Sequence, residues 1–370
     1  MTSLLDARPD LDTDIPIPSP RRTSDLGKED VALLAGSAAA GLLIAWLLCF
    51  RLVDGISLVG FGLIAYAGFL ALYAVLVTDQ HGRLIAADRV AAVVVASVAL
   101  VAATPLVLLL SFLAVKGFHA LRPGFFVHDQ RGITPLQPAT AGGGSHALVG
   151  TLEAVGLALV WSLPLGLAAA VFLNESRSPW RRPVRIFVDA MSGLPSVVAG
   201  LFVFATLILP FADRSPLFGF NGFMASLALA LTMLPTITRT VDVVLRLVPD
   251  GLREASLALG TSRSRTVWSV VFPTARSGIT TAVVLAIARS VGETAPLLFT
   301  SFGYDLMNGS PFSGAQESLP LFIYRNIRKP DPAAISRGYT GALVLMATVL
   351  ALFAIARFIG RDRTRSKGRR

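Results

Sequence analysis

The chain has 370 residues, of which 54% are hydrophobic and only 15% carry a charge. A soluble globular domain carries about 25% charged residues, so this composition excludes an ordinary soluble protein and indicates a membrane protein. The net charge of +10 does not indicate a nucleic-acid partner, because membrane proteins gather Lys and Arg in their cytoplasmic loops. Cys49 is the only cysteine and the four histidines have no ligand spacing, so we expect neither a disulfide framework nor a metal site.

Eight apolar blocks follow one another along the chain, each long enough to cross a hydrocarbon core of ~30 Å. They predict an all-α polytopic membrane protein with spans at 31–50, 56–77, 90–115, 147–173, 187–210, 221–247, 277–302 and 338–359. Residues 1–30 are acidic and contain several prolines, and the first apolar block has full spanning length. We therefore expect a disordered tail there and no cleaved signal peptide.

The distribution of basic residues predicts the orientation in the membrane. An even number of spans places both ends of the chain on one side. With these ends inside, the inner segments are roughly twice as dense in Lys and Arg as the outer ones, chiefly through residues 174–186 and 357–370. The asymmetry predicts a multi-pass plasma-membrane protein with cytoplasmic N- and C-termini, and a basic cytoplasmic tail at 361–370.

Two outer segments are long. Residues 116–146 contain three prolines and a glycine triplet, which favours an irregular loop. Residues 303–337 contain an apolar group that could lie against the outer membrane face or a partner, or could belong to an ordinary connection: Leu319, Leu321, Phe322 and Ile323.

The cytoplasmic loop 248–276 predicts a short surface helix. Pro249 stops the preceding span, and Asp250 is a suitable capping residue. Leu252, Ala255, Ser256 and Leu259 then share one face at helical spacing, and Gly260 follows as a stop.

This loop resembles the EAA motif of permease subunits of bacterial ABC importers. Glu254, Ala255 and Ser256 stand for Glu-Ala-Ala, Gly260 follows after three residues, and Pro273 closes the pattern at the family's spacing. In that family the helix docks in a cleft of the ATP-hydrolysing subunit and transmits its closure to the spans. The resemblance implies that Glu254 and Gly260 are central to that contact.

The chain itself contains no nucleotide-binding loop. Its only Gly-Lys pair, Gly27-Lys28, is followed by Glu29 and lacks the preceding glycine at P-loop spacing. The glycine triplet 142–144 is predicted to lie on the outer side, where there is no ATP. We therefore expect no cofactor and no catalytic residue in this chain, with ATP and Mg²⁺ bound by a separate ATPase subunit.

The seventh span contains two charges, Arg289 and Glu293, within the stretch AIARSVGETAP. A charge at the centre of a span costs roughly 2.5–3.5 kcal/mol on the insertion scale, so it is rarely without a role. Arg289 lies about 18 Å along the helix from Ser277, and Glu293 follows at i+4 on the same face. Pro296 lacks an N–H, which predicts a kink and an unpaired Gly292 carbonyl.

Two roles are open for this pair. Arg289 and Glu293 could form a structural ion pair, or Arg289 could face a water-accessible pathway and bind an oxyanion such as phosphate, for which a planar guanidinium is suited. Glu293 would then hold the guanidinium between substrate visits. For Glu153, Arg239 and Asp242, which lie near span ends, we expect interfacial anchoring or pairing within the chain.

The segment IARSVGETAPLLFT resembles the corresponding helix of the A-type permease of phosphate-specific ABC importers, and Ala295 and Pro296 distinguish it from the partner permease. MSGLPSVVAGLFVF at 191–204 and LRLVPDGLREASLALG also resemble that family, and the likeness extends over about 90–360. It implies a role for Arg289 and Glu293 in phosphate translocation.

The resemblance implies a type I ABC importer core of about six spans, with an extra N-terminal hairpin. The organisation would be the hairpin at 31–89, the first core span and outer loop at 90–145, and the transmembrane domain at 146–360. It further implies alternating access, a C-type permease partner, two ATPase subunits and an extracellular phosphate-binding protein.

Other functions stay open at this point. A permease for sulfate, molybdate or a phosphonate would share the loop spacing, and only the GETAP segment speaks against it. An ATP-independent anion transporter or channel would need no docking loop. A membrane-embedded enzyme would need a nucleophile–base or metal-ligand constellation, and none is recognisable in the sequence.

Overall fold

The computed structural model describes residues 27–52 and 57–359, and in these ranges the chain is helical, with one isolated bridge between Phe302 and Gln316. The predicted all-α fold is therefore confirmed for the described part of the chain. The predicted tail 361–370 lies outside the described residues. So does most of the predicted tail 1–30, although Lys28–Asp30 already belong to the first helix.

The chain divides into two compact units, Met1–Val107 and Leu108–Arg370, with the boundary inside one long helix. The first unit contains α1 (Lys28–Leu47), the π-helical turn η1 (Leu48–Leu52), α2 (Leu58–His81) and the beginning of α3 (Arg83–Gly117). The buried side chains of Tyr73 and Val77 from α2 pack with Ala86 of α3. Arg89 of α3 forms an ion pair with Asp30 of α1. The helices of this unit are thus joined by apolar packing and by one charged contact.

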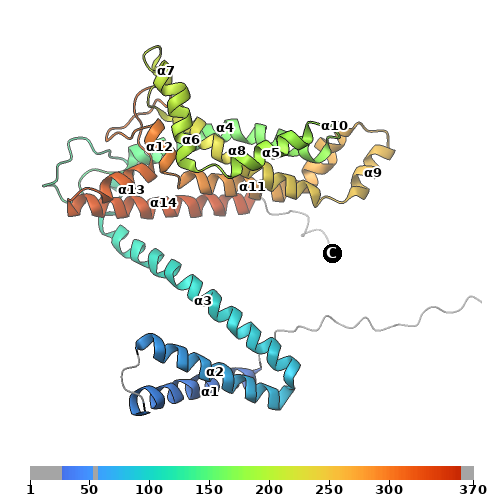
Figure 1. The fold of residues 1–370 in the computed structure, drawn as a ribbon. Coiled ribbons are helices and arrows are strands. Elements are labelled where there is room, and N and C mark those ends of the chain that lie inside the picture. The colour runs from blue at the N-terminus through green and yellow to red at the C-terminus, as the bar shows by residue number, and fades with distance from the viewer. Residues whose placement is uncertain (1–26, 53–56, 360–370) are drawn as a thin grey trace, which may run out of the picture. The chain divides into compact units, whose positions relative to one another are not determined.

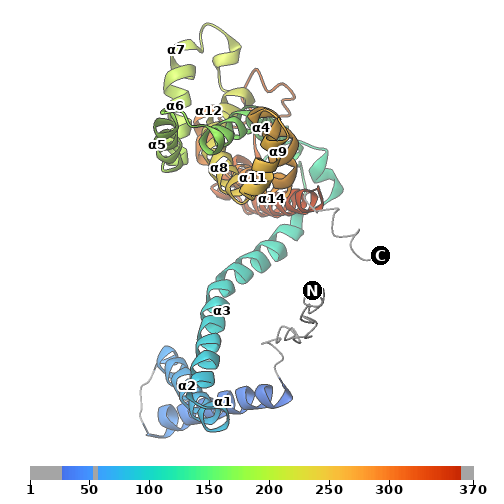
Figure 2. The ribbon, with the colours of Figure 1, turned by 90° about the vertical axis from the view of Figure 1, so that its right-hand side faces the viewer.

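The second unit is a bundle of long helices with shorter ones at its ends (Figure 1, Figure 2). Its elements are η2 (Phe118–Ala120), η3 (Pro123–Phe126), α4 (Ser145–Glu175), α5 (Arg181–Ser192), α6 (Ser196–Val203), η4 (Phe204–Ile208), α7 (Leu209–Phe211), η5 (Pro216–Phe218), α8 (Gly222–Arg246), α9 (Asp250–Ala258), α10 (Arg263–Thr266), η6 (Val267–Val271), α11 (Phe272–Val291), α12 (Ala295–Thr300), α13 (Leu319–Ile327) and α14 (Pro332–Ile359).

The centre of this unit is α8, which packs along α4 and also contacts α11. The buried layer between them is built from small and medium side chains, among them Ala158 of α4, Leu229 of α8 and Ala282 of α11. The close approach of α4 and α8 needs Gly166, because a Cβ atom there would lie 2.8 Å from Cγ2 of Ile237. α14 covers α11 on the other side and also packs against α13.

Within residues 27–52 and 57–359, seven helices are long and apolar enough to cross a membrane. An eighth is obtained if the helices at Arg181–Ser192 and Ser196–Phe211, bent by 103° at a short break, are counted together. The predicted number of eight spans is reached only in that case.

The predicted continuous span at 187–210 is wrong. The chain breaks between Ser192 and Ser196, where Pro195 has no N–H to donate and disfavours helical geometry at Leu194. The helix before the break, α5, is amphipathic and carries charged side chains that pair with α8, which separates it from the apolar segment that follows.

The N-terminal end of α4 provides a test of this packing. Gly150 touches the chain at Glu317, and a Cβ atom at residue 150 would lie 2.0 Å from the Glu317 carbonyl oxygen. We expect Gly150→Ala to lower the free energy of unfolding by about 1–3 kcal/mol, because the backbone must shift to admit the methyl group. Gly156→Ala on the same helix is the matched control, since no atom lies within 4 Å of its Cβ position. Equal thermal unfolding temperatures of the two variants in detergent would contradict the packing described.

Candidate functional site

The predicted surface helix is α9, Asp250–Ala258. Gly260 adopts a φ of +79°, a left-handed conformation that favours glycine, and so ends the helix as predicted. The predicted capping role of Asp250 is wrong. The N-cap residue is Pro249, and the Asp250 carboxylate instead pairs with Arg253 at 2.9 Å, because Asp250 already lies in the first helical turn.

The loop is shorter than the predicted 248–276. From Arg263 onward the chain is helical without interruption through α10, η6 and α11. Pro273 lies in the first turn of α11, directly after the π-helical turn η6. Because proline has no N–H and its ring crowds the preceding turn, a widened turn at this point lets the helix continue past Pro273.

The residues of the EAA-like motif lie on two sides of α9. Glu254 and Ala255 are exposed, and so are the neighbouring Leu257 and Leu259, which leaves an outward surface with acidic and apolar groups. Ser256 is buried. Ser256 stands where the motif has its second Ala, and its hydroxyl makes specific contacts.

Three hydroxyl groups join α9 to α10. Ser256 Oγ lies 2.8 Å from Thr261 Oγ1 and 3.0 Å from Thr266 Oγ1, and the two threonine oxygens are 3.0 Å apart. Thr261 Oγ1 also donates to the Ser256 carbonyl at 2.7 Å. The sequence contains the two threonines, five and ten residues after Ser256, but only the fold shows that the three hydroxyl groups converge.

Arg289 lies in the last turn of α11, where the helix dipole favours a cation, and 57% of its side chain is exposed. Its Nε lies 3.7 Å from Oε1 of Glu293, whose side chain is 18% exposed. The two predicted residues are therefore brought together, and most of the guanidinium surface is left accessible. The predicted depth of Arg289 in the bilayer stays a prediction.

The predicted kink at Pro296 is replaced by a complete break. α11 ends at Val291, with Gly292 as its C-cap, and α12 begins only at Ala295. Pro296 thus lies in the first turn of α12, where its missing N–H has no intrahelical partner to lose. Glu293 belongs to the break and not to the helix face on which the sequence placed it.

A second exposed ion pair joins α5 to α8. Arg239 Nη2 lies 2.7 Å from Oδ1 of Asp189, and about half of each side chain is exposed. The neighbouring Asp242 is buried and accepts contacts from Arg185 at 3.2 Å and from Arg246 at 2.8 Å. Arg239 and Asp242 each pair with another residue of the chain, and the expectation of pairing within the chain is confirmed for both. Glu153 accepts a hydrogen bond from Gln316, also within the chain.

The two long segments that are predicted to lie outside, 116–146 and 303–337, contact each other. The Gln130 N–H donates to the Asp305 carbonyl at 2.9 Å, and the Met307 N–H donates to Asp129 Oδ2 at 3.0 Å. Residues 319–327 form α13. Leu319, Leu321 and Phe322 are buried in the chain itself, so the suggestion that this apolar group covers the outer membrane face or a partner is wrong for these three residues.

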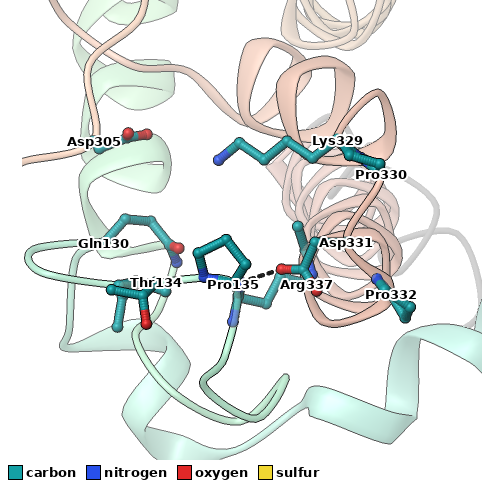
Figure 3. A pocket seen from close by; sticks show the side chains of 11 residues that line it. Gln130, Thr134, Pro135, Asp305, Lys329, Pro330, Asp331, Pro332 and Arg337 are labelled. Carbon is teal, nitrogen blue, oxygen red and sulfur yellow. Dashed lines mark hydrogen bonds and ion pairs between the residues drawn. The ribbon is translucent and has the colours of Figure 1, made fainter.

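A pocket of about 500 Å³ lies between these outer segments and the start of α14 (Figure 3). Its charged lining residues are Asp305, Lys329, Asp331 and Arg337. Arg337 is buried and pairs with Asp331 at 3.5 Å, while Arg325 pairs with Asp305 at 3.2 Å. Among the lining residues the two carboxylates, Asp305 and Asp331, equal in number the two cations, Lys329 and Arg337, so the lining carries no net charge.

Glu317 is the most deeply buried acidic group of this outer region, at 2% exposure, and it pairs with Arg325. Burial raises the pKa of the Glu317 carboxyl from its ordinary value near 4.5 to about 7, although the Arg325 charge acts in the opposite direction.

The sequence of the chain is similar to the sequences of known transport proteins. Residues 162–365 match a family described as "Binding-protein-dependent transport system inner membrane component". The "Phosphate transport system permease protein PstA 1" of Mycobacterium tuberculosis is 42% identical over 270 residues, which cover 72% of this chain and 85% of the relative. The corresponding protein of Yersinia pestis is 36% identical over 229 residues, covering 60% and 74%. A solved structure of the MetNI methionine ABC transporter, in inward-facing conformation, covers 58% of this chain and 92% of its own, at 21% identity and a TM-score of 0.46.

The raised pKa of Glu317 gives the fold a pH dependence. Between pH 4.5 and about 7 the folded chain holds a proton on Glu317 that the unfolded chain has released. The stabilisation of the fold by this proton is therefore complete below pH 4.5 and is lost as the pH rises through about 7. We expect Glu317→Gln to remove this component, up to about 3 kcal/mol, from the unfolding free energy measured across that range. The exposed Asp213→Asn is the control. A pH profile of Glu317→Gln that matches the wild type would contradict the assignment.

Proposed function

The chain belongs to the family of binding-protein-dependent transport system inner membrane components, and on that premise we propose that it is a permease subunit of an ATP-driven importer of inorganic phosphate. Relatives described as phosphate transport permeases share 32–42% identity with it. The observation that carries the proposal is Arg289, a largely exposed guanidinium at the end of a broken membrane helix, next to the carboxylate of Glu293.

The geometry of this pair suits reversible anion binding. A guanidinium forms two parallel hydrogen bonds with a tetrahedral oxyanion, and in a water-poor pathway such charge-assisted bonds are strong. A distance of 3.7 Å between Arg289 Nε and Glu293 Oε1 is longer than a hydrogen bond, so a phosphate oxygen can compete for the guanidinium. Glu293 then re-forms the pair after the anion leaves, which prevents trapping.

The remaining parts of the importer are assigned to other chains. α9, with exposed Glu254 and Ala255, would dock on one of two ATPase subunits, which bind the ATP and Mg²⁺. A C-type permease would complete the pathway beside Arg289. An extracellular phosphate-binding protein would dock on the outer segments around residues 121–144 and 303–318. Closure of the ATPase pair would move α9 and expose Arg289 alternately outward and inward.

The proposed orientation is tested with reporter fusions. With cytoplasmic termini, the basic α4–α5 connection and α9 lie inside and the 121–144 segment lies outside. A green fluorescent protein joined after residue 370 should fluoresce, and alkaline phosphatase inserted after Gln137 should be active. Alkaline phosphatase inserted after Arg177 is the control and should be inactive. The opposite pattern of activities would contradict the orientation and with it the docking side of α9.

The anion role of Arg289 is tested in liposomes that contain the reconstituted complex and internal ATP. We expect Arg289→Gln to reduce labelled-phosphate uptake by roughly 100-fold, the effect of losing two charge-assisted hydrogen bonds, while the complex still assembles. Arg83→Gln, an exposed arginine outside the segments assigned to docking or to the pathway, is the matched control.

The same vesicles separate the remaining alternatives. Unchanged phosphate uptake by Arg289→Gln would make the pair a structural contact. Uptake of sulfate, molybdate or a phosphonate in preference to phosphate would identify another oxyanion as the substrate. Uptake without ATP would refute the importer mechanism and favour an anion channel.

A further inference from the structure

Arg253 lies beside Glu254 in α9, but its side chain points into the chain and is only 14% exposed. Its Nη1 donates to the Val248 carbonyl at 2.7 Å, and its Nη2 donates to the Leu245 carbonyl at 2.7 Å. The guanidinium also donates to Glu175 Oε1 at 3.1 Å through Nε, and to Asn174 Oδ1 at 3.3 Å through Nη2. With the Asp250 contact, all three nitrogens of the group are used.

These acceptors lie at the ends of two membrane helices. Asn174 and Glu175 are the last two residues of α4, and the Leu245 and Val248 carbonyls belong to the C-terminal turn of α8 and the residues just after it. Carbonyls at a helix C-terminus lack intrahelical partners, and a cation there also meets the negative end of the helix dipole. Arg253 therefore holds α9, the end of α4 and the end of α8 at one point.

α9 has few other contacts with α4 and α8. α9 packs mainly against α10 and η6, and Ser256 is its one buried residue. The hydroxyl contacts of Ser256 lead to Thr261, just before α10, and to Thr266, the last residue of α10, and not to α4 or α8. Besides the chain connection at residues 247–249, the direct side-chain link from α9 to the ends of both α4 and α8 is therefore the Arg253 guanidinium.

We propose that Arg253 is the positioning residue that transmits movement of α9 to α4 and α8, and so couples ATP hydrolysis to opening of the pathway. The inference rests on the proposed function and adds to it the connection inside this chain. α4 and α8 are packed closely along their length, so a displacement at their shared end moves both as a unit. Lysine cannot replace Arg253, because a single ammonium on a flexible stem cannot reach acceptors on both helix ends in fixed geometry.

The first test measures phosphate uptake and ATP hydrolysis by the reconstituted complex in the same vesicles. We expect Arg253→Lys and Arg253→Gln to assemble and hydrolyse ATP while phosphate imported per ATP falls roughly tenfold or more, the effect of losing one hydrogen bond to a charged group. Arg177→Gln is the matched control, because Arg177 is an exposed arginine on the α4–α5 connection, two residues after Glu175. Unchanged coupling, or uptake and hydrolysis that fall in parallel, would overturn the proposal.

The second test does not depend on phosphate. Spin labels are placed on cysteines introduced at Arg177 and Gly251, in a chain whose one cysteine, Cys49, is replaced by alanine. The 177–251 distance should stay narrowly distributed with and without bound ATP in the complex, and should broaden in Arg253→Gln. Equal widths in both chains would overturn the proposal. A wild-type complex that imports no phosphate would refute the proposed function, and the label distances would still decide the role of Arg253.

Discussion

The close packing of α4 on α8 is the constraint on which the rest of the second unit depends. In lipid the hydrophobic effect does not drive helices together, so their association rests on close contact between small residues. Gly166 lets α4 approach Ile237 of α8, and alanines such as Ala158 and Ala225 continue the layer. α11 packs against the same α8, and α5 and α13 also contact the pair. α9 is joined to the ends of α4 and α8 through Arg253.

The rigid centre permits two broken helices beside it. α6 and α12, the segments that follow the two breaks, meet at Gly200, where a Cβ atom would lie 2.5 Å from Cα of Pro296. Irregular backbone at membrane depth is tolerated only where protein buries it or water reaches it. Each break also lies next to an exposed ion pair, Asp189–Arg239 at the first and Arg289–Glu293 at the second. Broken backbone and accessible charge thus occur together, as a polar pathway requires.

The helical segments and the α9 loop could be read from the sequence because their signals are local. Apolar blocks of spanning length need no tertiary information, and the left-handed turn at Gly260 follows from the residue type alone. The two helix breaks, after α5 and after α11, depend instead on contacts between segments that are far apart in the sequence. Pro195 and Pro296 are visible in the sequence, but a proline in an apolar run is also compatible with a kinked span. The contact between Gly200 and Pro296, which accompanies the break, cannot be read from the sequence. Leu319 and Phe322 were ambiguous for a related reason, since an apolar group outside a span fits a chain interior as well as a partner surface.

The α9 helix shows why a motif identifies a function more easily than a mechanism. Adjacent residues on a helix point about 100° apart, so Arg253 and Glu254 face different neighbours although they are joined in sequence. Arg253 and Ser256, at i and i+3, form the inward side with contacts to α4, α8 and α10, while Glu254 and Ala255 stay exposed. The motif match emphasises Glu254 and Ala255, the exposed residues that are proposed to meet the ATPase subunit. The proposed transmission also involves the inward side, because Arg253 fixes α9 to the ends of α4 and α8.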